Sequence, residues 1–480
     1  MASTSNQAFR SDSELVDYLT TLESEEECSD DNYIFGESSD SDSDDIVTES
    51  VTVPSQSTPK RSRRDACAPL FQWTDNEYTP QIHDFDDTNA GITPGMFTDE
   101  STCLDYFKHF VSNDLVVKIV EETNNFYDYL TSKVAPSPSS RLQKWTHTDE
   151  NEIYLFLAIT MLMARNKKLS LKDYWSNDPL LECPQFKNLM TRDRYFLLLR
   201  VLHFCDNNNQ PEGDRLYKIK LIVNHLREKF SDSFRPFNHL CIDESMVLFK
   251  GRLIFRQFIP SKRTRFGIKL FIICDCETGY ILDFIVYTGK CTEIVSTEEY
   301  GVSGAVVQTL MQKYLGQGHT LWVDNGYTSP FLFNFLHSNN VNSCGTVRKT
   351  RKGMPSLKKK LKKGEVEAKY TTKIMALRWL DRREVCMLST LHSNELKNTD
   401  KKDKQNIPIQ KPTCVIQYNR NMGAVDRSDM MISSVDSLHK SMKWYRKLFF
   451  HIMDMCILNS QTLYNVKTGK NIPLADFQLS

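Results

Sequence analysis

The sequence lacks the features that would indicate a membrane, secreted or zinc-binding protein. It has no run of about 18 apolar residues, the length a transmembrane helix needs, and no basic-then-apolar leader at its start. Its 13 cysteines are scattered, with no C-x₂-C pair, and no histidine or cysteine set has the spacing of zinc ligands. We therefore expect a soluble, non-secreted protein with no membrane association, reduced thiols and no structural zinc.

Strong bases are nearly absent from the first 50 residues, although the net charge of the whole chain is only −1. Residues 1–50 contain fifteen Asp or Glu and, among strong bases, only Arg10. The rest of the chain is therefore clearly basic. Such a surplus of positive charge favours a polyanionic partner, and DNA is the first candidate.

The N-terminal region is predicted to be a disordered acidic tail covering residues 1–65. It has too few large apolar residues to offset the entropy lost on ordering. Serines among its aspartates would suit an acidophilic kinase, or the tail could simply be solubilising. The stretch Lys60-Arg-Ser-Arg-Arg64 is either a nuclear-import signal or a basic linker. The import interpretation places the protein in the nucleus.

Apolar periodicity then divides the chain into helical and β-rich parts. After an extended linker at 66–100, residues 101–237 show helical spacing and predict a helical domain. Residues 238–346 contain β-rich runs, with Glu277-Thr-Gly279 predicted to close a hairpin. The basic stretch at 347–413 reads as an inserted module, after which residues 414–439 resume the fold of residues 238–346. Residues 440–480 form a helical segment expected to pack on the first helical domain.

Two aspartates follow apolar runs that read as buried strands. Asp243 follows Leu240-Cys-Ile242, and Asp324 follows Leu321-Trp-Val323. A carboxylate at the end of a buried strand is held rigidly beside the cleft beyond the sheet. Asp426 and Asp429 lie three residues apart, so a helix would place both on one face. Any one of them alone could be a surface or capping residue, but the set predicts a site for Mg²⁺.

Four long stretches around these aspartates resemble the conserved blocks of piggyBac-type transposases. The match as a whole runs in order from about residue 100 to about residue 465 and includes these stretches. The stretches are Cys241-Ile-Asp-Glu-Ser-Met-Val-Leu-Phe-Lys-Gly-Arg252 with Gln257-Phe-Ile-Pro-Ser-Lys262 and Gly267-Ile-Lys269, Leu321-Trp-Val-Asp-Asn-Gly-Tyr327, Tyr418-Asn-Arg-Asn-Met-Gly-Ala-Val-Asp-Arg-Ser-Asp429, and Lys443-Trp-Tyr-Arg-Lys-Leu-Phe-Phe450.

This resemblance implies an α/β fold: an RNase H-like (DDE/D transposase) catalytic core at 238–346 and 414–439, with an inserted β-containing module at 347–413. The flanking helical domain at 101–237 would serve dimerisation and DNA binding. The order of strand, hairpin, helix, strand and helix after residue 238 agrees, and puts Asp243 and Asp324 on adjacent strands. The family's catalytic and metal-binding positions correspond to Asp243, Asp324 and Asp426. Asp429 would either bind an ion or orient its neighbours. Glu244 is left out because a continuing strand would turn it to the opposite face.

The implied activity is cut-and-paste DNA transposition at TTAA sites. Two Mg²⁺ ions, replaceable by Mn²⁺ and about 3.5–4 Å apart, would stabilise the attacking and leaving oxygens. The partners would be double-stranded DNA, comprising the transposon ends and the target, and a second copy of the chain, because synapsis joins two ends. Basic residues near the catalytic blocks are predicted to bind DNA phosphates, although each could be a solvated or ion-paired side chain. They are Arg252, Lys262, Arg263, Arg265, Lys269, Lys358, Lys359, Lys360, Lys362 and Lys363.

One departure from the family keeps an alternative function open. Many members end in a cysteine-rich zinc domain that helps to read the transposon ends, and this sequence contains no counterpart. The alternative is a domesticated, transposase-derived DNA-binding or regulatory protein that does not transpose. A stand-alone RNase H-like nuclease ranks last, because it would need neither the insertion nor the helical domain.

Overall fold

The computed structural model describes residues 71–480 except 134, 139, 261, 263, 403, 404, 407, 438–440 and 442. The predictions for the acidic tail, for Lys60-Arg-Ser-Arg-Arg64 and for Arg263 lie outside the described residues. In the described part of the chain, no helix combines the length and the apolar character of a membrane span. The cysteines in this part are free thiols, and most are buried.

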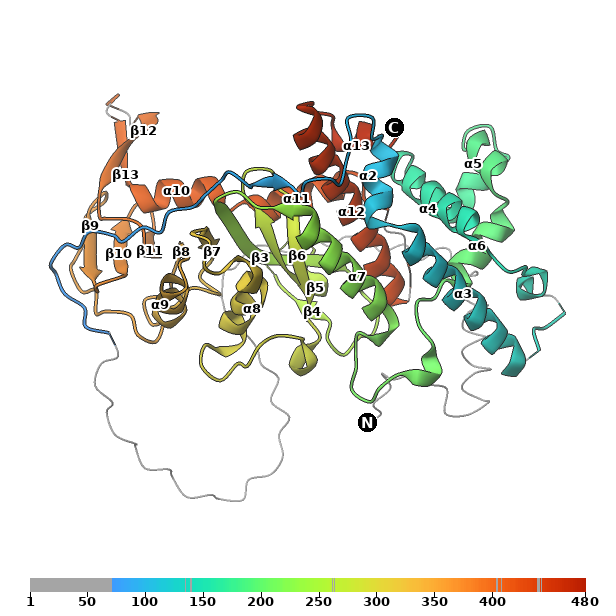
Figure 1. Cartoon of the computed structure of the whole chain (residues 1–480), viewed down its shortest axis with the longest axis horizontal. Helices are drawn as coiled ribbons and strands as arrows, with labels where there is room; N and C mark the ends of the chain where they lie inside the picture. Colours follow the sequence, from blue (N-terminus) through green and yellow to red (C-terminus); the bar gives the residue numbers. More distant parts are fainter. Residues whose placement is uncertain are drawn as a thin grey trace, which may run out of the picture.

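A nine-stranded mixed sheet forms the centre of the molecule (Figure 1). β3 pairs with β7 and β7 with β8 in parallel, and the other neighbours are antiparallel. In spatial order the strands are β4 (Gln257–Phe258), β5 (Phe266–Asp275), β3 (His239–Leu248), β7 (Thr320–Val323), β8 (Asn342–Thr346), β11 (Glu384–Ser389), β10 (Met375–Leu380) and β9 (Val366–Tyr370), and β6 (Ile281–Val286) also pairs with β5.

The predicted neighbours in this sheet are confirmed. The two strands that carry the aspartate motifs, β3 and β7, are adjacent and parallel, and Ile242 pairs with Val323. The predicted hairpin is β5–β6, with Gly279 at φ +76° in its turn. The expectation that a strand ends before Asp243 is wrong. β3 continues to Leu248, because β5 is long enough to pair with it along its full length.

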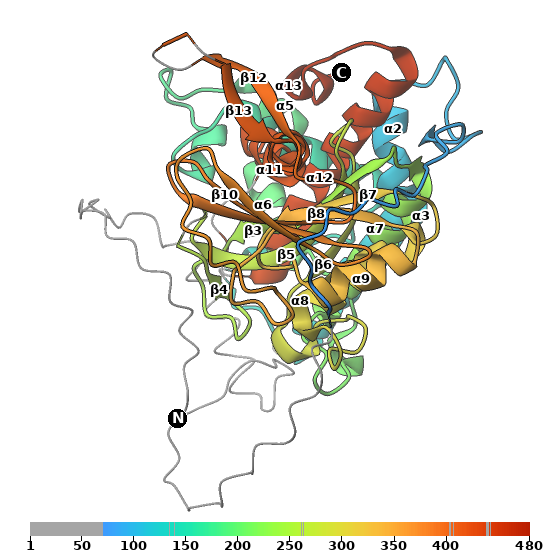
Figure 2. The ribbon, with the colours of Figure 1, turned by 90° about the vertical axis from the view of Figure 1, so that its left-hand side faces the viewer.

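Helices cover both faces of the sheet (Figures 1 and 2). α8 (Gly301–Met311) and α9 (Pro330–Ser338) lie on one face, where Ser329 caps α9 as its sequence predicts. α10 (Thr413–Asn421) and α11 (Ala424–Ser434) pack on the other face. The helical spacing predicted for Asp426 and Asp429 is therefore present, and both lie in α11.

The second lobe is helical. Three of its helices begin at side-chain caps that the sequence supplies, which are Thr102, Asp149 and Thr191. α7 also packs on β6 and so joins the lobe to the sheet. The helices are α2 (Cys103–Phe110), α3 (Asn113–Lys133), α4 (Glu150–Arg165), α5 (Pro184–Leu189), α6 (Arg192–Val201) and α7 (Tyr217–Ser233).

α12 (Trp444–Thr468) connects the two lobes, and the short α13 (Leu474–Phe477) packs against it. Every residue of α12 from Tyr445 to Leu463 is buried, as expected of a helix that is enclosed on all sides. It contacts α2, α7 and α11, and the Asn459 amide bonds both backbone groups of Ile281 in β6 at 2.9 Å. The predicted packing of the C-terminal segment on the helical domain is confirmed.

Asp454, in the middle of α12, is a fully buried carboxyl group. It accepts hydrogen bonds from the hydroxyl and amide of Ser437 at 2.7 and 3.3 Å. Burial raises its pKa well above the usual value, against the lowering effect of the Ser437 hydroxyl, while nearby Asp436 raises the pKa and Lys167 lowers it. The folded protein therefore keeps a proton here that the unfolded chain loses near pH 4.

This proton predicts that stability falls as pH rises from about 4 toward the raised pKa, by at most about 1.4 kcal/mol per pH unit for one group. Asp454→Asn, which mimics the protonated form, is expected to remove this contribution. Urea unfolding at pH 5, 6 and 7 in metal-free buffer measures it, with the exposed Asp476→Asn as control. Parallel pH profiles for Asp454→Asn and the wild type would contradict the assignment.

The segment from residue 71 to residue 100 is extended, as predicted, and lies along the sheet lobe (Figure 1, blue). Thr74 forms a bridge with Tyr370, and the backbone of His83 bonds the Asn342 side chain. Further along, β1 (Gly91–Ile92) pairs with β2 (Phe234–Arg235). The segment therefore ties the far end of the sheet to the helical lobe.

Gly318 allows the close approach of this segment. Its φ is +83°, and a Cβ there would lie 1.9 Å from the Asp84 carbonyl oxygen. Gly318→Ala is expected to destabilise the fold by more than the about 1–2 kcal/mol of left-handed strain and to release residues near 84 to proteases. Gly279→Ala is the matched control, because it has φ +76° and open space. Equal losses for the two variants in urea unfolding would contradict the steric argument.

The residues of the basic insertion module extend the central sheet through β9, β10 and β11. β12 (Leu396–Lys402) and β13 (Pro408–Pro412) form a separate exposed ribbon that projects from the body (Figure 1). After the ribbon the chain enters α10, which returns to the face that carries α11.

Candidate active site

Asp243 and Asp324 lie on the two adjacent parallel strands, where their pairing ends. Asp243 is the first residue of β3 beyond the β7 pairing, and one of its carboxylate oxygens accepts from the Glu244 amide at 2.8 Å. Asp324 directly follows β7, and its Oδ1 accepts from the Gly326 amide at 2.8 Å. A Cβ at residue 326 would lie 3.0 Å from that oxygen, so glycine lets the turn close around the carboxylate.

α11 brings the other two aspartates to the same face of β3. The Ser245 hydroxyl donates to Asp429 Oδ1 at 2.6 Å, and the Cys241 thiol donates to the Met422 carbonyl at 3.0 Å. Alternation along the strand places residues 241, 243 and 245 on one face. Ser245 was missed in the sequence reasoning, although its position two residues after Asp243 could have identified it.

Lys262 lies among these carboxylates. Its Nζ is 3.2 Å from Asp426 Oδ1 and donates to the Glu244 carbonyl at 2.9 Å. It was predicted as a DNA-phosphate contact. The structure instead directs it from the turn between β4 and β5 back over the sheet. Asp426 is the most open member of the set, with 67% of its side chain exposed.

Burial and negative charge raise the pKa values of the carboxyl groups. Burial raises the pKa of Asp243 to about 7, with Lys262 opposing the shift and Glu244 and Asp324 adding to it. Burial raises the pKa of Asp429 to about 6, against the Ser245 hydrogen bond and Lys262. Burial, then Glu244, raises the pKa of Asp324. Burial is therefore the main reason that these carboxyl groups resist ionisation, and the ammonium groups of Lys262 and Lys269 offset it only in part.

Glu244 and Lys269 lie on the opposite face of β3 and β5 from Asp243 and Ser245, as alternation requires. The Tyr327 hydroxyl donates to Glu244 Oε2 at 3.1 Å, and Lys269 Nζ lies 3.9 Å from the same oxygen. Lys269, predicted to bind DNA, is therefore beside a carboxylate. Glu244 still affects the site electrostatically, because it raises the pKa of both Asp243 and Asp324.

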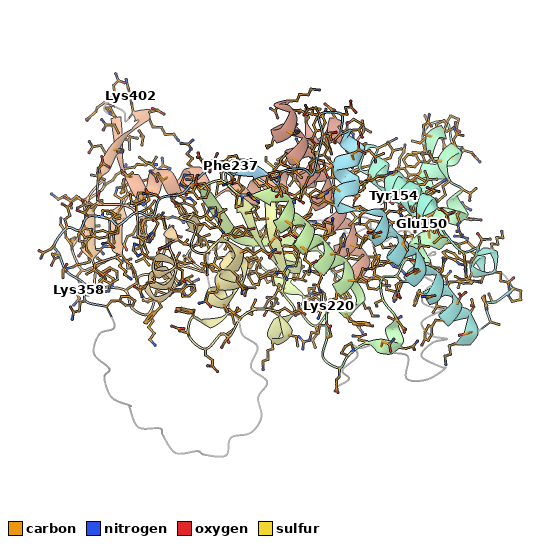
Figure 3. The ribbon with its side chains drawn as sticks, in the orientation of Figure 1. Glu150, Tyr154, Lys220, Phe237, Lys358 and Lys402 are labelled. Carbon is orange, nitrogen blue, oxygen red and sulfur yellow. The ribbon has the colours of Figure 1, made fainter. Side chains whose placement is uncertain are left out.

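The remaining predicted DNA contacts are exposed. Arg252 and Arg265 flank the β4 segment, and Arg263 is outside the described residues. The lysines of the basic stretch lie in an irregular loop whose backbone is anchored, because the amides of Lys358 and Lys359 both donate to Glu367 Oε1. Figure 3 shows Lys358 pointing away from the body. The lysines of this loop are Lys358, Lys359, Lys360, Lys362 and Lys363, all exposed.

The donor chemistry of the cluster fits Mg²⁺, since four carboxylates supply only hard oxygen ligands. Hydrogen bonds orient Asp243, Asp324 and Asp429. In each case the bond from the Glu244 amide, the Gly326 amide or the Ser245 hydroxyl uses one of the two carboxylate oxygens. Within the described residues, however, no three acidic, histidine or cysteine side chains are assembled closely enough to hold an ion. The roles of the four aspartates as metal ligands stay a prediction.

Comparison with known proteins decides the family. The profile of the family described as Transposase IS4 matches residues 102–461, more than half of the chain. The chain belongs to this transposase family. Human piggyBac transposable element-derived protein 3 is 26% identical over 457 residues, covering 91% of this chain and 73% of the relative. Human piggyBac transposable element-derived protein 2 is 23% identical over 422 residues, covering 85% and 69%.

The fold of this transposase-family chain is that of a solved relative. A chain in the cryo-EM structure of the piggyBac transposase synaptic complex with hairpin DNA superposes with a TM-score of 0.70. The sequence identity is 23%, and the match covers 81% of each chain. The mixed α/β fold predicted from the sequence is therefore shared with piggyBac transposase, and the resemblance to this family is confirmed.

Proposed function

We propose that this protein is a piggyBac-like DNA transposase that cleaves and rejoins DNA strands at TTAA sites with Mg²⁺. The observation that carries the proposal is that Asp243, Asp324, Asp426 and Asp429 approach one face of β3, although no three of them are close enough to hold an ion in the described residues. These carboxylates come from two strands and a helix that are far apart in the sequence. Burial, with smaller contributions from Glu244 and Asp324, raises the pKa of Asp243 to about 7, and a divalent cation would offset this cost of burying the charged carboxylate.

The catalytic lobe is proposed to be RNase H-like. Support comes from the order of β6, β5, β3, β7 and β8, in which antiparallel strands precede a parallel set. Asp243, Asp324 and Asp426 would hold the Mg²⁺ ions, and Asp429 would bind an ion or orient its neighbours. When bound, the ions would supply activation of a water or a 3′-OH and stabilisation of the leaving oxygen. The chain itself contributes by orienting these carboxylates through the Glu244 and Gly326 amides and the Ser245 hydroxyl.

DNA is the proposed partner, and exposed Lys and Arg side chains on both sides of the carboxylates would hold it. Arg252 and Arg265 lie on one side, and the lysines of residues 358–363 form a basic loop further along the sheet. Such contacts would make binding strongly salt-dependent. We also propose a homodimer, which would join two transposon ends. A nuclear location is proposed from the basic stretch Lys60-Arg-Ser-Arg-Arg64.

A plasmid-cleavage assay tests the proposed function. Purified protein is incubated with supercoiled plasmid in Mg²⁺ or Mn²⁺, and the broken ends are mapped by sequencing. Metal-dependent ends concentrated at TTAA are the expected result. Ends spread without regard to TTAA would contradict the proposed site preference, and cleavage that persists in a chelator would contradict the metal chemistry.

The second candidate is a transposase-derived DNA-binding protein without strand chemistry. The ion pair between Lys262 and Asp426, together with the lack of an assembled three-ligand group in the described residues, favours it. Salt-dependent duplex binding, no cleavage, and Mn²⁺ binding that is identical in the wild type and Asp243→Asn would support this candidate over the transposase.

A further inference from the structure

The edge of the sheet beside the carboxylates carries an exposed aromatic pair. Phe258 in β4 and Phe266 in β5 are direct cross-strand neighbours with ring centroids 4.5 Å apart and planes at 29°. Their exposed fractions are 55% and 41%, which is unusual for stacked phenylalanines. We call Phe258 and Phe266 the aromatic platform.

Arg256 lies over the platform in a fixed position. Its Nη1 donates to the carbonyls of Lys250 and Gly251 at 2.8 and 3.1 Å, and its guanidinium carbon lies 5.7 Å from the Phe266 ring centroid. A planar cation that the backbone holds beside an exposed ring offers a second flat surface with positive charge.

The charged residues of the segment that carries the platform are all of one sign. Residues 248–267 contain six Lys or Arg and no Asp or Glu. Exposed apolar rings in such a basic segment are complementary to a strand of nucleic acid, in which phosphates alternate with flat nucleobases. A protein partner or a membrane would make less use of stacked rings and a fixed guanidinium.

The platform faces the same way as the carboxylates. Asp243 pairs with Ile272 in β5, and alternation puts residues 272, 270, 268 and 266 on one face. Six residues of strand separate Phe266 from Ile272, roughly 20 Å at the rise of a β-strand. That length corresponds to about six nucleotides of B-form DNA. The turn between Phe258 and Phe266 also carries Lys262, which reaches Asp426.

We propose that the aromatic platform stacks an unpaired base of the DNA strand that is processed at the carboxylates, within about six nucleotides of the reacting phosphate. This inference rests on the proposed function and adds to it a contact with bases rather than with phosphates. A base that leaves the duplex loses its stacking on neighbouring bases, and an exposed aromatic ring can replace that stacking.

The test compares three DNA probes by equilibrium binding: a blunt duplex, the duplex with a six-nucleotide single-stranded extension, and the same extension with abasic sites. The abasic probe keeps the phosphates and removes the bases. The wild type is expected to bind the normal extension about tenfold more tightly than the abasic one. Phe258→Leu and Phe266→Leu, which stay apolar but lose the ring, are expected to abolish that difference and to bind the blunt duplex as the wild type does.

Leu180→Ser, at a 91% exposed site in the helical lobe, is the matched control and should keep the wild-type preference. Quenching of 2-aminopurine in the extension by the wild type, but not by either Phe variant, would add direct support for stacking. An unchanged preference in both Phe variants, or duplex binding without any preference in the wild type, would overturn the inference and leave the proposed function standing. Absence of all DNA binding would overturn both.

The alternative to a DNA base on the aromatic platform is a second copy of the chain. Sedimentation equilibrium distinguishes it: a wild-type dimer that becomes a monomer on Phe258→Leu, with the preference for the normal extension retained, would assign the platform to self-association and overturn the inference. The same oligomeric state in both proteins, with loss of the preference, supports base stacking.

Discussion

Asp243→Asn is expected to abolish metal-dependent strand cleavage while the protein still folds and binds duplex DNA. Asp243 lies on the central strand β3, and burial raises its pKa to about 7, with Glu244 and Asp324 adding to the shift. The amide keeps the size and the hydrogen bond to the Glu244 amide, but it cannot supply a negative ligand. Loss should exceed about 100-fold, because substitutions in the outer shell of metal sites already lose about 10- to 100-fold.

Two measurements separate this result from simple unfolding. Mn²⁺ titration followed by electron paramagnetic resonance should show saturable binding in the wild type and weak or no binding in Asp243→Asn. Urea unfolding in metal-free buffer should show that the variant is at least as stable as the wild type near pH 7, because burying the charged carboxylate is unfavourable. Asp128→Asn, an exposed position on α3, serves as control. Full cleavage activity in Asp243→Asn would remove the residue from the chemistry.

Lys262→Met is expected to strengthen Mn²⁺ binding, by up to about fivefold. The Lys262 ammonium lies 3.2 Å from Asp426 Oδ1 and lowers the pKa of both Asp243 and Asp429. It therefore neutralises part of the charge that would attract a divalent ion, and binding of the ion must compete with it. The modest size follows from the exposure of Asp426, since open ion pairs contribute only about 0–1 kcal/mol.

The comparison with Lys262→Arg makes this prediction specific. Arginine keeps the positive charge, so Mn²⁺ affinity should stay within about twofold of the wild type if charge is the cause. Lys250→Met, in the same segment but exposed, should also leave the affinity unchanged. In metal-free buffer, Lys262→Met should unfold at a lower temperature than the wild type. Added Mn²⁺ should remove this difference in unfolding temperature. Weaker Mn²⁺ binding in a folded Lys262→Met protein would show that the lysine assists the ion.

Local features of the fold could be predicted because nearby residues determine them. Ser329 and Pro330 start α9, Gly279 turns the β5–β6 hairpin, and the three-residue spacing of Asp426 and Asp429 suits the helix they occupy. The end of β7 before Asp324 was predicted for the same reason, since its apolar run stops there. Caps, turns and side-chain alternation depend on residues a few positions apart, so they can be predicted from the sequence.

The continuation of β3 beyond Asp243 could not be predicted in this way. The residues after Ile242 are polar enough to suggest a strand end, yet pairing with the whole of β5 extends the strand to Leu248. Likewise, β9, β10 and β11 join the central sheet only because β8 offers a free edge to β11. Strand ends depend on the partner that supplies hydrogen bonds, and the partner lies elsewhere in the chain.

The sequence by itself determined the family, the helical and β-rich parts of the chain, and the four aspartates with their neighbouring bases. Only the tertiary structure decided that Ser245 holds Asp429, that Lys262 turns inward to Asp426, and that Lys269 lies beside Glu244. It also decided that Phe258 and Phe266 remain exposed as a pair. The physical reason is range: Ser245 and Lys262 meet residues 184 and 164 positions away, and such contacts depend on how whole elements pack.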